Sequence, residues 1–252
     1  MVQIALQGVI AIFEIVIGRP GLTSNPWCLT GSMIAGVAGA YGLLRLFGST
    51  ITPWMKFGLP QPLRTVPAVL LLTLGGWILS AEIGILTNRA VPMPKVIEEM
   101  FRALLNGRNP IGLFLALVIA APLFEEITCR GIVLPALRKR WGTGIAIAGS
   151  AVVFGALHMN PWQFFYATIL GLTLGWLRVQ SGSILPGILL HALNNGISWS
   201  LIVHPTVFPE GQAIADDQLK EIPATWLLAS AVLLPCGYLL LGRPAQTPST
   251  PD

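Results

Sequence analysis

The chain has 252 residues, of which 54% are hydrophobic and only 10% charged, and its mean hydropathy is +0.72. Soluble domains carry about a quarter charged residues, so this composition excludes an ordinary water-soluble domain and indicates a membrane protein. The net charge of +4 does not indicate a nucleic-acid partner, because the basic residues lie mostly at the ends of apolar runs, where they anchor membrane helices.

Apolar runs of helical length follow one another along the chain. The first lacks the basic segment and small-residue cleavage site of a signal peptide, so we interpret it as a membrane helix. Most runs approach the ~20 residues that cross ~30 Å of hydrocarbon. The sequence predicts an all-α polytopic bundle of about eight spans, or seven if the first lies at the membrane surface: Met1–Gly18, Cys28–Gly48, Val66–Thr87, Pro110–Arg130, Gly144–His158, Gln163–Val179, Ile184–Val203 and Thr225–Gly242.

The connecting segments add no soluble domain. Apolar positions at helical spacing in Val96–Leu105 predict an amphipathic helix on the membrane surface, with a solvated connector as the alternative. His204–Pro223 is polar and acidic, and Arg243–Asp252 is predicted to be disordered. We expect one membrane domain with three regions: N-terminal helices and the connector in 1–109, a core in 110–203, and the polar loop, last helix and tail in 204–252.

Basic residues favour, by a small margin, an orientation with both termini in the cytoplasm. The densest cluster, Arg138–Arg140, marks a cytoplasmic loop by the positive-inside rule. The residues expected on its side are Arg178, Arg243, Lys56 and Arg64, and those expected on the opposite side are Arg89, Lys95, Arg102 and Arg108.

Two adjacent glutamates, Glu125 and Glu126, end the apolar run Pro110–Phe124. A charged side chain inside a bilayer is costly, so the pair needs partners, water or a proton. Arg130 shares a helical face with Glu126, whereas Glu125 points about 100° away. One glutamate can therefore hold the arginine while the other faces a cavity as a general base. The structural alternative is an Arg–Glu clamp near the lipid headgroups.

His158 ends the apolar run Ala146–Leu157. A turn near Trp141 and Gly142 lies about 16 residues after Glu125 and about 17 before His158, so an antiparallel hairpin would place both side chains ~24–26 Å from the turn. The spacing therefore predicts that they meet at the same depth. The alternative is an isolated interfacial histidine.

His191 and Asn195 are four residues apart, with Asn194 beside them. Imidazole and carboxamide groups on one helical face can stabilise an oxyanion, orient water or hold a metal. The alternative is hydrogen bonding that joins helices of the bundle.

Together these residues resemble the CPBP family of intramembrane proteases, which includes CAAX prenyl endopeptidases and bacteriocin-processing proteins. Glu125–Arg130 matches E-E-x-x-x-R, Phe154–His158 matches F-x-x-x-H and His191–Asn195 matches H-x-x-x-N. The matching core runs from about Pro110 to Trp199, and the first hundred residues carry no motif that we assign. Cys129 stands where the family often has an aromatic residue.

The resemblance implies a glutamate-type peptidase with a polar intramembrane cavity and a catalytic core in 110–203. It implies that a glutamate and a histidine activate water, a histidine and an asparagine form the oxyanion hole, and a Glu–Arg pair supports the site. The residues that activate water would be Glu125 and His158. The oxyanion hole would be His191 and Asn195, and the supporting pair Glu126 and Arg130. The expected setting is a lipid bilayer, as in a prokaryotic inner membrane, with a membrane-anchored or lipidated polypeptide as substrate and no cofactor.

Three alternatives stay open. Glu125, His158 and His191 make a His₂Glu set, the ligand type of several zinc peptidases. A non-catalytic scaffold or immunity protein would use the polar residues for packing only. A transporter would use Glu14, Glu82 and Glu125 to carry protons or cations, but no inverted repeat is visible, and a buried hydrogen bond or a place near the membrane interface is expected for Glu82.

Overall fold

The computed structural model describes residues 56–95, 110–203 and 222–242, together with the helical residues Gly31, Ile34 and Ala38. Every regular element in this part of the chain is helical, which confirms the all-α class. Several predicted segments lie outside the described residues: Met1–Gly18, the rest of Cys28–Gly48, the amphipathic helix Val96–Leu105, most of His204–Pro223 and the tail Arg243–Asp252.

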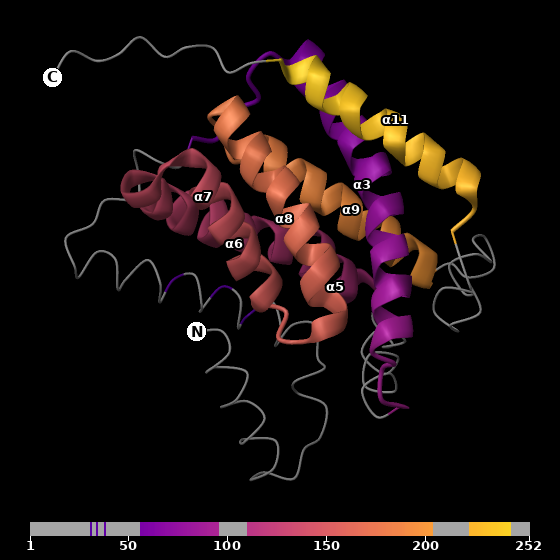
Figure 1. Ribbon diagram of the computed structural model, residues 1–252. Helices are drawn as coiled ribbons and strands as arrows, with labels where there is room; N and C mark the ends of the chain where they lie inside the picture. The colour runs from indigo at the N-terminus through magenta and orange to yellow at the C-terminus, as the bar shows by residue number, and fades with distance from the viewer. Residues whose placement is uncertain are drawn as a thin grey trace, which may run out of the picture.

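The described helices form one bundle (Figure 1). They are α3 (Pro62–Ala90), α5 (Pro110–Phe114), η1 (Leu115–Ala120), α6 (Ala121–Glu126), η2 (Ile127–Val133), α7 (Leu134–Ala156), α8 (Pro161–Ser181), α9 (Leu185–Val203) and α11 (Ala224–Leu241), where η denotes a π-helix. Three segments of the described chain are long and apolar enough to cross a membrane: Pro62–Ala90, Pro110–Ala156 and Ala224–Leu241. The chain is therefore an integral membrane protein.

The predicted span Pro110–Arg130 lies inside a helical segment that runs on to the predicted turn near Gly142. The helix continues through Arg130 and η2 into α7, and the backbone leaves helical geometry at Gly142, with φ 79° and ψ 175°. This backbone conformation is essentially restricted to glycine. The chain reverses there, since a Cβ on Gly149 would lie only 2.8 Å from Leu137 Cδ1. The predicted turn is thus present, and the helix passes Arg130 because this charge is paired inside the bundle.

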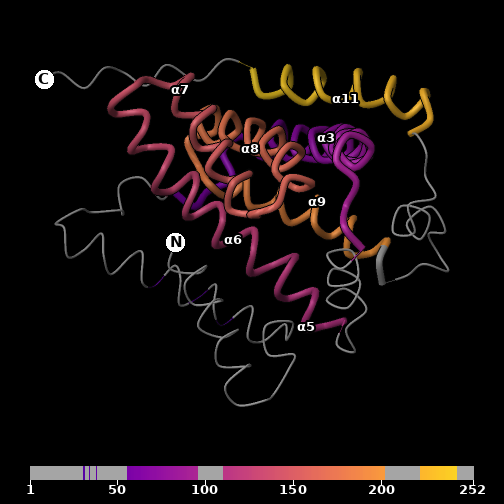
Figure 2. The backbone as a smooth tube through the Cα atoms, turned by 60° about the horizontal axis from the view of Figure 1, so that its bottom comes forward, coloured from indigo at the N-terminus to yellow at the C-terminus, as the bar shows by residue number. Residues whose placement is uncertain are grey.

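Helix α8 lies in the middle of the bundle, in contact with α3, α7 and α9, while α11 packs on the outer side of α3 (Figures 1 and 2). Glycines allow these close approaches. A Cβ at Gly155 would lie 2.7 Å from the Phe164 carbonyl oxygen, and one at Gly171 would lie 2.9 Å from Ala151 Cα. Small residues at such contacts let helices approach closely where no hydrophobic effect drives them together. This packing fixes α7 against α8.

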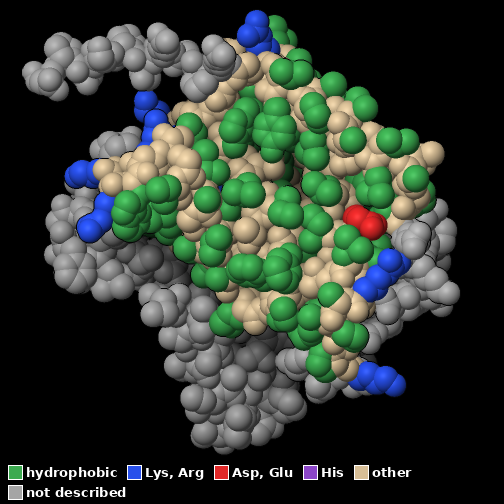
Figure 3. All heavy atoms as spheres, in the orientation of Figure 1, with side chains coloured by type: hydrophobic (Ala, Val, Ile, Leu, Met, Phe, Trp, Pro, Cys, Tyr) green, Lys and Arg blue, Asp and Glu red, His purple; other side chains and the backbone are tan. Residues whose placement is uncertain are grey.

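The two ends of the bundle are tied by side-chain hydrogen bonds. Ser183 Oγ lies 2.9 Å from the Lys56 carbonyl oxygen and accepts a bond from the Gly58 N–H at 3.0 Å, which joins the segment before α3 to the α8–α9 turn. At the other end, the Trp162 indole donates to the Val91 carbonyl at 2.7 Å. Hydrophobic side chains cover much of the face in Figure 3, and Lys and Arg side chains gather at its margins, as expected for a surface in lipid.

We predict that Gly155→Ala lowers the thermal stability of the purified protein in detergent micelles. The new methyl group would overlap α8, and overpacking of this kind costs about 1–3 kcal/mol. Gly144→Ala is the matched control, because nothing lies within 4 Å of a Cβ at that helical position. Equal melting temperatures for the two variants would contradict the close α7–α8 contact.

Candidate functional site

The two adjacent glutamates occupy different environments. The Glu126 side chain is fully buried, and its Oε1 accepts a hydrogen bond from Arg130 Nη1 at 2.9 Å, which confirms the predicted pairing. Arg130, also fully buried, donates from Nη2 to the Gly171 carbonyl of α8 at 2.8 Å. The Glu125 side chain remains 22% exposed. Glu126 is thus neutralised inside the bundle, and Glu125 is the carboxylate that keeps an exposed fraction.

His191 lies between the two carboxylates. Its Nδ1 is 3.4 Å from Glu126 Oε1, and its Nε2 is 3.8 Å from Glu125 Oε2. One turn earlier on α9, a Cβ at Gly187 would lie 2.9 Å from Glu126 Oε2. Glycine at this position therefore lets α9 approach α6. The sequence predicted that His191 and Asn195 share a helical face, but it did not predict that His191 lies between the two glutamates. The one feature of the sequence that relates to this contact is the glycine at position 187, one turn before His191.

Asn195 connects α9 to η1. Its Nδ2 donates to the Leu117 carbonyl at 2.9 Å, and its Oδ1 lies 3.4 Å from Asn194 Nδ2. A carboxamide carries two N–H groups, so one donor of Asn195 is left for another acceptor. Leu117 lies in a π-helical segment, and such segments are frequent at functional sites.

His158 is held by Phe154, one turn earlier. Its Nδ1 is 3.0 Å from the Phe154 carbonyl oxygen. Because a carbonyl oxygen only accepts, this bond puts a proton on Nδ1, and in the neutral imidazole the lone pair is then on Nε2. The rings of His158 and His191 both pack edge-to-face on the Phe154 ring, each with 5.3 Å between centroids.

The structure thus places Glu125 and His158 in one cluster, connected through His191 and Phe154. Both residues lie in the described chain, and no ion pair or hydrogen bond joins them; His191 and Phe154 stand between them. Phe154 belongs to the F-x-x-x-H motif, but the sequence alone assigned it no role. Four buried side-chain atoms of the cluster make no hydrogen bond to the protein: Glu126 Oε2, Arg130 Nε, His191 Nδ1 and Asn194 Oδ1. Polar atoms of this kind are typically satisfied by ordered water.

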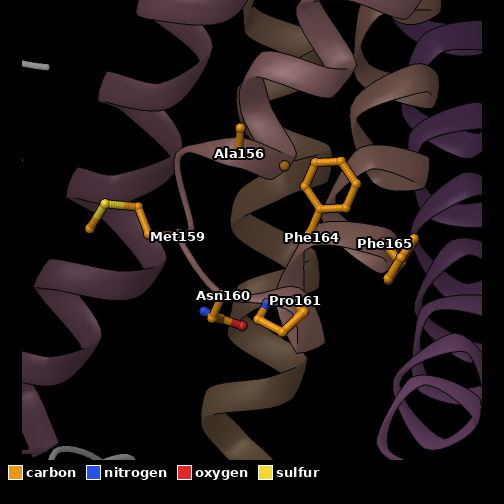
Figure 4. Close-up of a pocket in the computed structure, with 7 residues that line it drawn as sticks. Ala156, Met159, Asn160, Pro161, Phe164 and Phe165 are labelled. Carbon is orange, nitrogen blue, oxygen red and sulfur yellow. The ribbon is translucent and has the colours of Figure 1, made fainter. Parts of the chain in front are cut away.

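The expected polar cavity stays a prediction, and two other pockets can be described. A pocket of about 280 Å³ lies at the α7–α8 turn, and its lining includes Met159, Phe164 and Phe165 (Figure 4). A second, of about 150 Å³, lies between α3, α8 and α11. Neither is lined by Glu125, His158, His191 or Asn195.

Two of the alternatives can be compared with these contacts. Glu82 Oε2 accepts a hydrogen bond from the Ile222 N–H at 3.3 Å, just before α11, as predicted for a structural glutamate. Within the described ranges, no group of three or more His, Cys, Asp or Glu side chains is arranged to hold a metal ion. The His₂Glu arrangement therefore gains no support from this part of the chain.

We predict that Arg130→Met strongly destabilises the protein, because it leaves the Glu126 carboxylate buried without a counter-charge. Breaking a buried pair in this way costs about 3–5 kcal/mol. The double variant Glu126→Gln/Arg130→Met should recover part of this loss in thermal unfolding of the purified protein. Strictly additive effects of the two substitutions would show that the pair is not coupled.

Comparison with known families identifies the central part of the chain. Residues 107–197 match the model of the family described as Rce1-like, type II CAAX prenyl endopeptidase. This match confirms the resemblance to the CPBP and CAAX protease family, and the matched residues contain the whole cluster described above. No curated protein and no solved structure matches the chain.

Proposed function

Because residues 107–197 match the family model of type II CAAX prenyl endopeptidases, we propose that the protein is an intramembrane endopeptidase that hydrolyses a peptide bond of a membrane-associated polypeptide by activating water. The observation that carries the proposal is the asymmetry of the adjacent glutamates. Arg130 neutralises the buried Glu126, while Glu125 is partly exposed and faces the His191 imidazole. Two carboxylates in different environments can take two different roles in one reaction.

In the proposed reaction, Glu125 is the general base. It takes a proton from water while the water oxygen bonds to the peptide carbonyl carbon, and the unprotonated Nε2 of His158 accepts the second hydrogen of that water as a hydrogen bond. The tetrahedral intermediate then collapses. As the carbon–nitrogen bond breaks, Glu125 returns its proton to the leaving amine.

The negative charge that develops on the carbonyl oxygen needs donors. The geometry supports His191 and Asn195 in this role, because both project from α9 toward the η1–α6 segment that carries Glu125. The Leu117 carbonyl fixes one N–H of Asn195 and leaves the other to donate. Donors held in place before the reaction stabilise the charge without reorganisation. Glu126 and Arg130 support the site by holding α6, α8 and α9 together.

The substrate class follows from the setting. A reaction centre inside an apolar bundle is reached by a polypeptide that is itself anchored in the membrane or carries a lipid. The family match supports this class, and its description as a CAAX prenyl endopeptidase makes a prenylated C-terminal peptide the first probe to use.

We predict that Glu125→Gln reduces cleavage by about 10²–10⁴-fold, the range for loss of a general base, while the protein still inserts and folds. The assay uses purified protein in liposomes with a farnesylated CAAX peptide and, separately, a hydrophobic helical peptide with a polar C-terminal extension. Glu82→Gln is the matched control, since the Glu82 carboxylate accepts a hydrogen bond from the Ile222 N–H, outside the cluster. Asn195→Ala should retain more activity than Glu125→Gln.

Cleavage by Glu125→Gln at the wild-type rate would refute the glutamate mechanism. If the wild-type protein cleaves neither peptide and the variants bind them as wild type does, the scaffold reading is favoured instead.

We also predict that chelators leave the cleavage rate unchanged, because the proposed chemistry needs only side chains and water. The measurement compares the rate before and after treatment with EDTA or 1,10-phenanthroline, followed by dialysis. A loss of activity that Zn²⁺ restores would support the metal-dependent alternative.

A further inference from the structure

We propose that Phe154 is a positioning residue that sets both catalytic histidines and the supporting arginine through one aromatic ring. This inference rests on the proposed function, in which His158 acts from the turn after α7 and His191 acts from α9. Phe154 is 1% exposed and lies on α7. It does not contact the reacting atoms in the proposed reaction, and it acts through its neighbours.

Three polar groups contact this ring from three directions of the bundle. His158 and His191 approach it edge-to-face, each with 5.3 Å between ring centroids and with interplanar angles of 75° and 80°. The Arg130 guanidinium carbon lies 4.7 Å from the ring centroid. A phenyl ring has a negative face and a positive edge, so it attracts a cation at its face and favours perpendicular aromatic neighbours. One ring thereby joins residues of α7, η2 and α9.

The backbone of Phe154 adds a second constraint on the same histidine. Its carbonyl oxygen bonds His158 Nδ1, while its ring limits the tilt of the imidazole. The carbonyl bond sets which nitrogen carries the lone pair, and the ring contact sets where that lone pair points. A leucine at position 154 would keep the carbonyl bond and most of the volume but lose the ring contacts. The two contributions can therefore be separated by substitution.

The Arg130 contact extends the effect to the buried ion pair. Arg130 holds Glu126, and Glu126 lies against His191 Nδ1. Phe154 therefore reaches His191 directly through the ring and indirectly through Arg130 and Glu126. Loss of the ring should displace His191 as well as His158, which a merely space-filling residue would not do.

The first experiment compares Phe154→Leu with Leu72→Ala in the peptide cleavage assay. Leu72 belongs, like Phe154, to the buried hydrophobic core and is also 1% exposed, but it packs against Gly237 of α11. We expect Phe154→Leu to lower kcat by about 10- to 100-fold with little change in KM, since small displacements of catalytic groups cost this much. Leu72→Ala should lower stability while kcat stays within about twofold of wild type. Replacement of Phe154 by 4-fluorophenylalanine, which keeps the ring, should retain most of kcat.

The second readout does not depend on activity, so it separates failure of this inference from failure of the proposed function. The chain has three histidines, and His158→Gln and His191→Gln assign their imidazole NMR signals. We expect Phe154→Leu to shift the imidazole 15N signals of both His158 and His191, which report tautomer and hydrogen bonding, by more than the loss of the ring current alone can cause. Leu72→Ala should shift neither. A Phe154→Leu protein with wild-type kcat, or with only one or neither histidine signal shifted, would overturn the inference.

Discussion

The structure depends on one buried ion pair, Glu126 with Arg130. Both side chains are fully buried in a chain that is 10% charged, and an unpaired charge in this setting is costly. The pair is therefore surrounded by groups that complete it: the Gly171 carbonyl from α8, the His191 imidazole from α9 and the Phe154 ring from α7. Because each comes from a different helix, satisfying the ion pair also sets how these helices meet.

The same arrangement gives the adjacent glutamates unequal chemistry. Glu126 uses its charge to hold Arg130, whereas Glu125 keeps an exposed fraction and faces His191. Peptide hydrolysis requires a base, an orienting group for water and donors for an oxyanion. The four side chains proposed for these roles lie within the residues that match the CAAX protease family: Glu125, His158, His191 and Asn195. The ion pair that stabilises the bundle thus also fixes the frame in which the proposed reaction takes place.

Much of this could be predicted from the sequence because it depends on local spacing. Apolar runs located the helices, the four-residue spacing predicted the Glu126–Arg130 pair, and Gly142 marked the turn. The bridging position of His191 depends on how α9 packs against α6, which no periodicity records. The π-helical segments η1 and η2 also leave no pattern in composition.

The proposed mechanism requires that Glu125, and not Glu126, is the reactive carboxylate. It is tested most directly by treating the native protein in lipid with a hydrophobic carbodiimide and locating the adducts by tandem mass spectrometry while cleavage is followed in the same samples. If Glu125 is the general base, the adduct forms on Glu125, Glu126 stays unmodified, and activity falls in proportion to the Glu125 adduct. An adduct that forms first on Glu126, or full modification of Glu125 with unchanged cleavage, would contradict it.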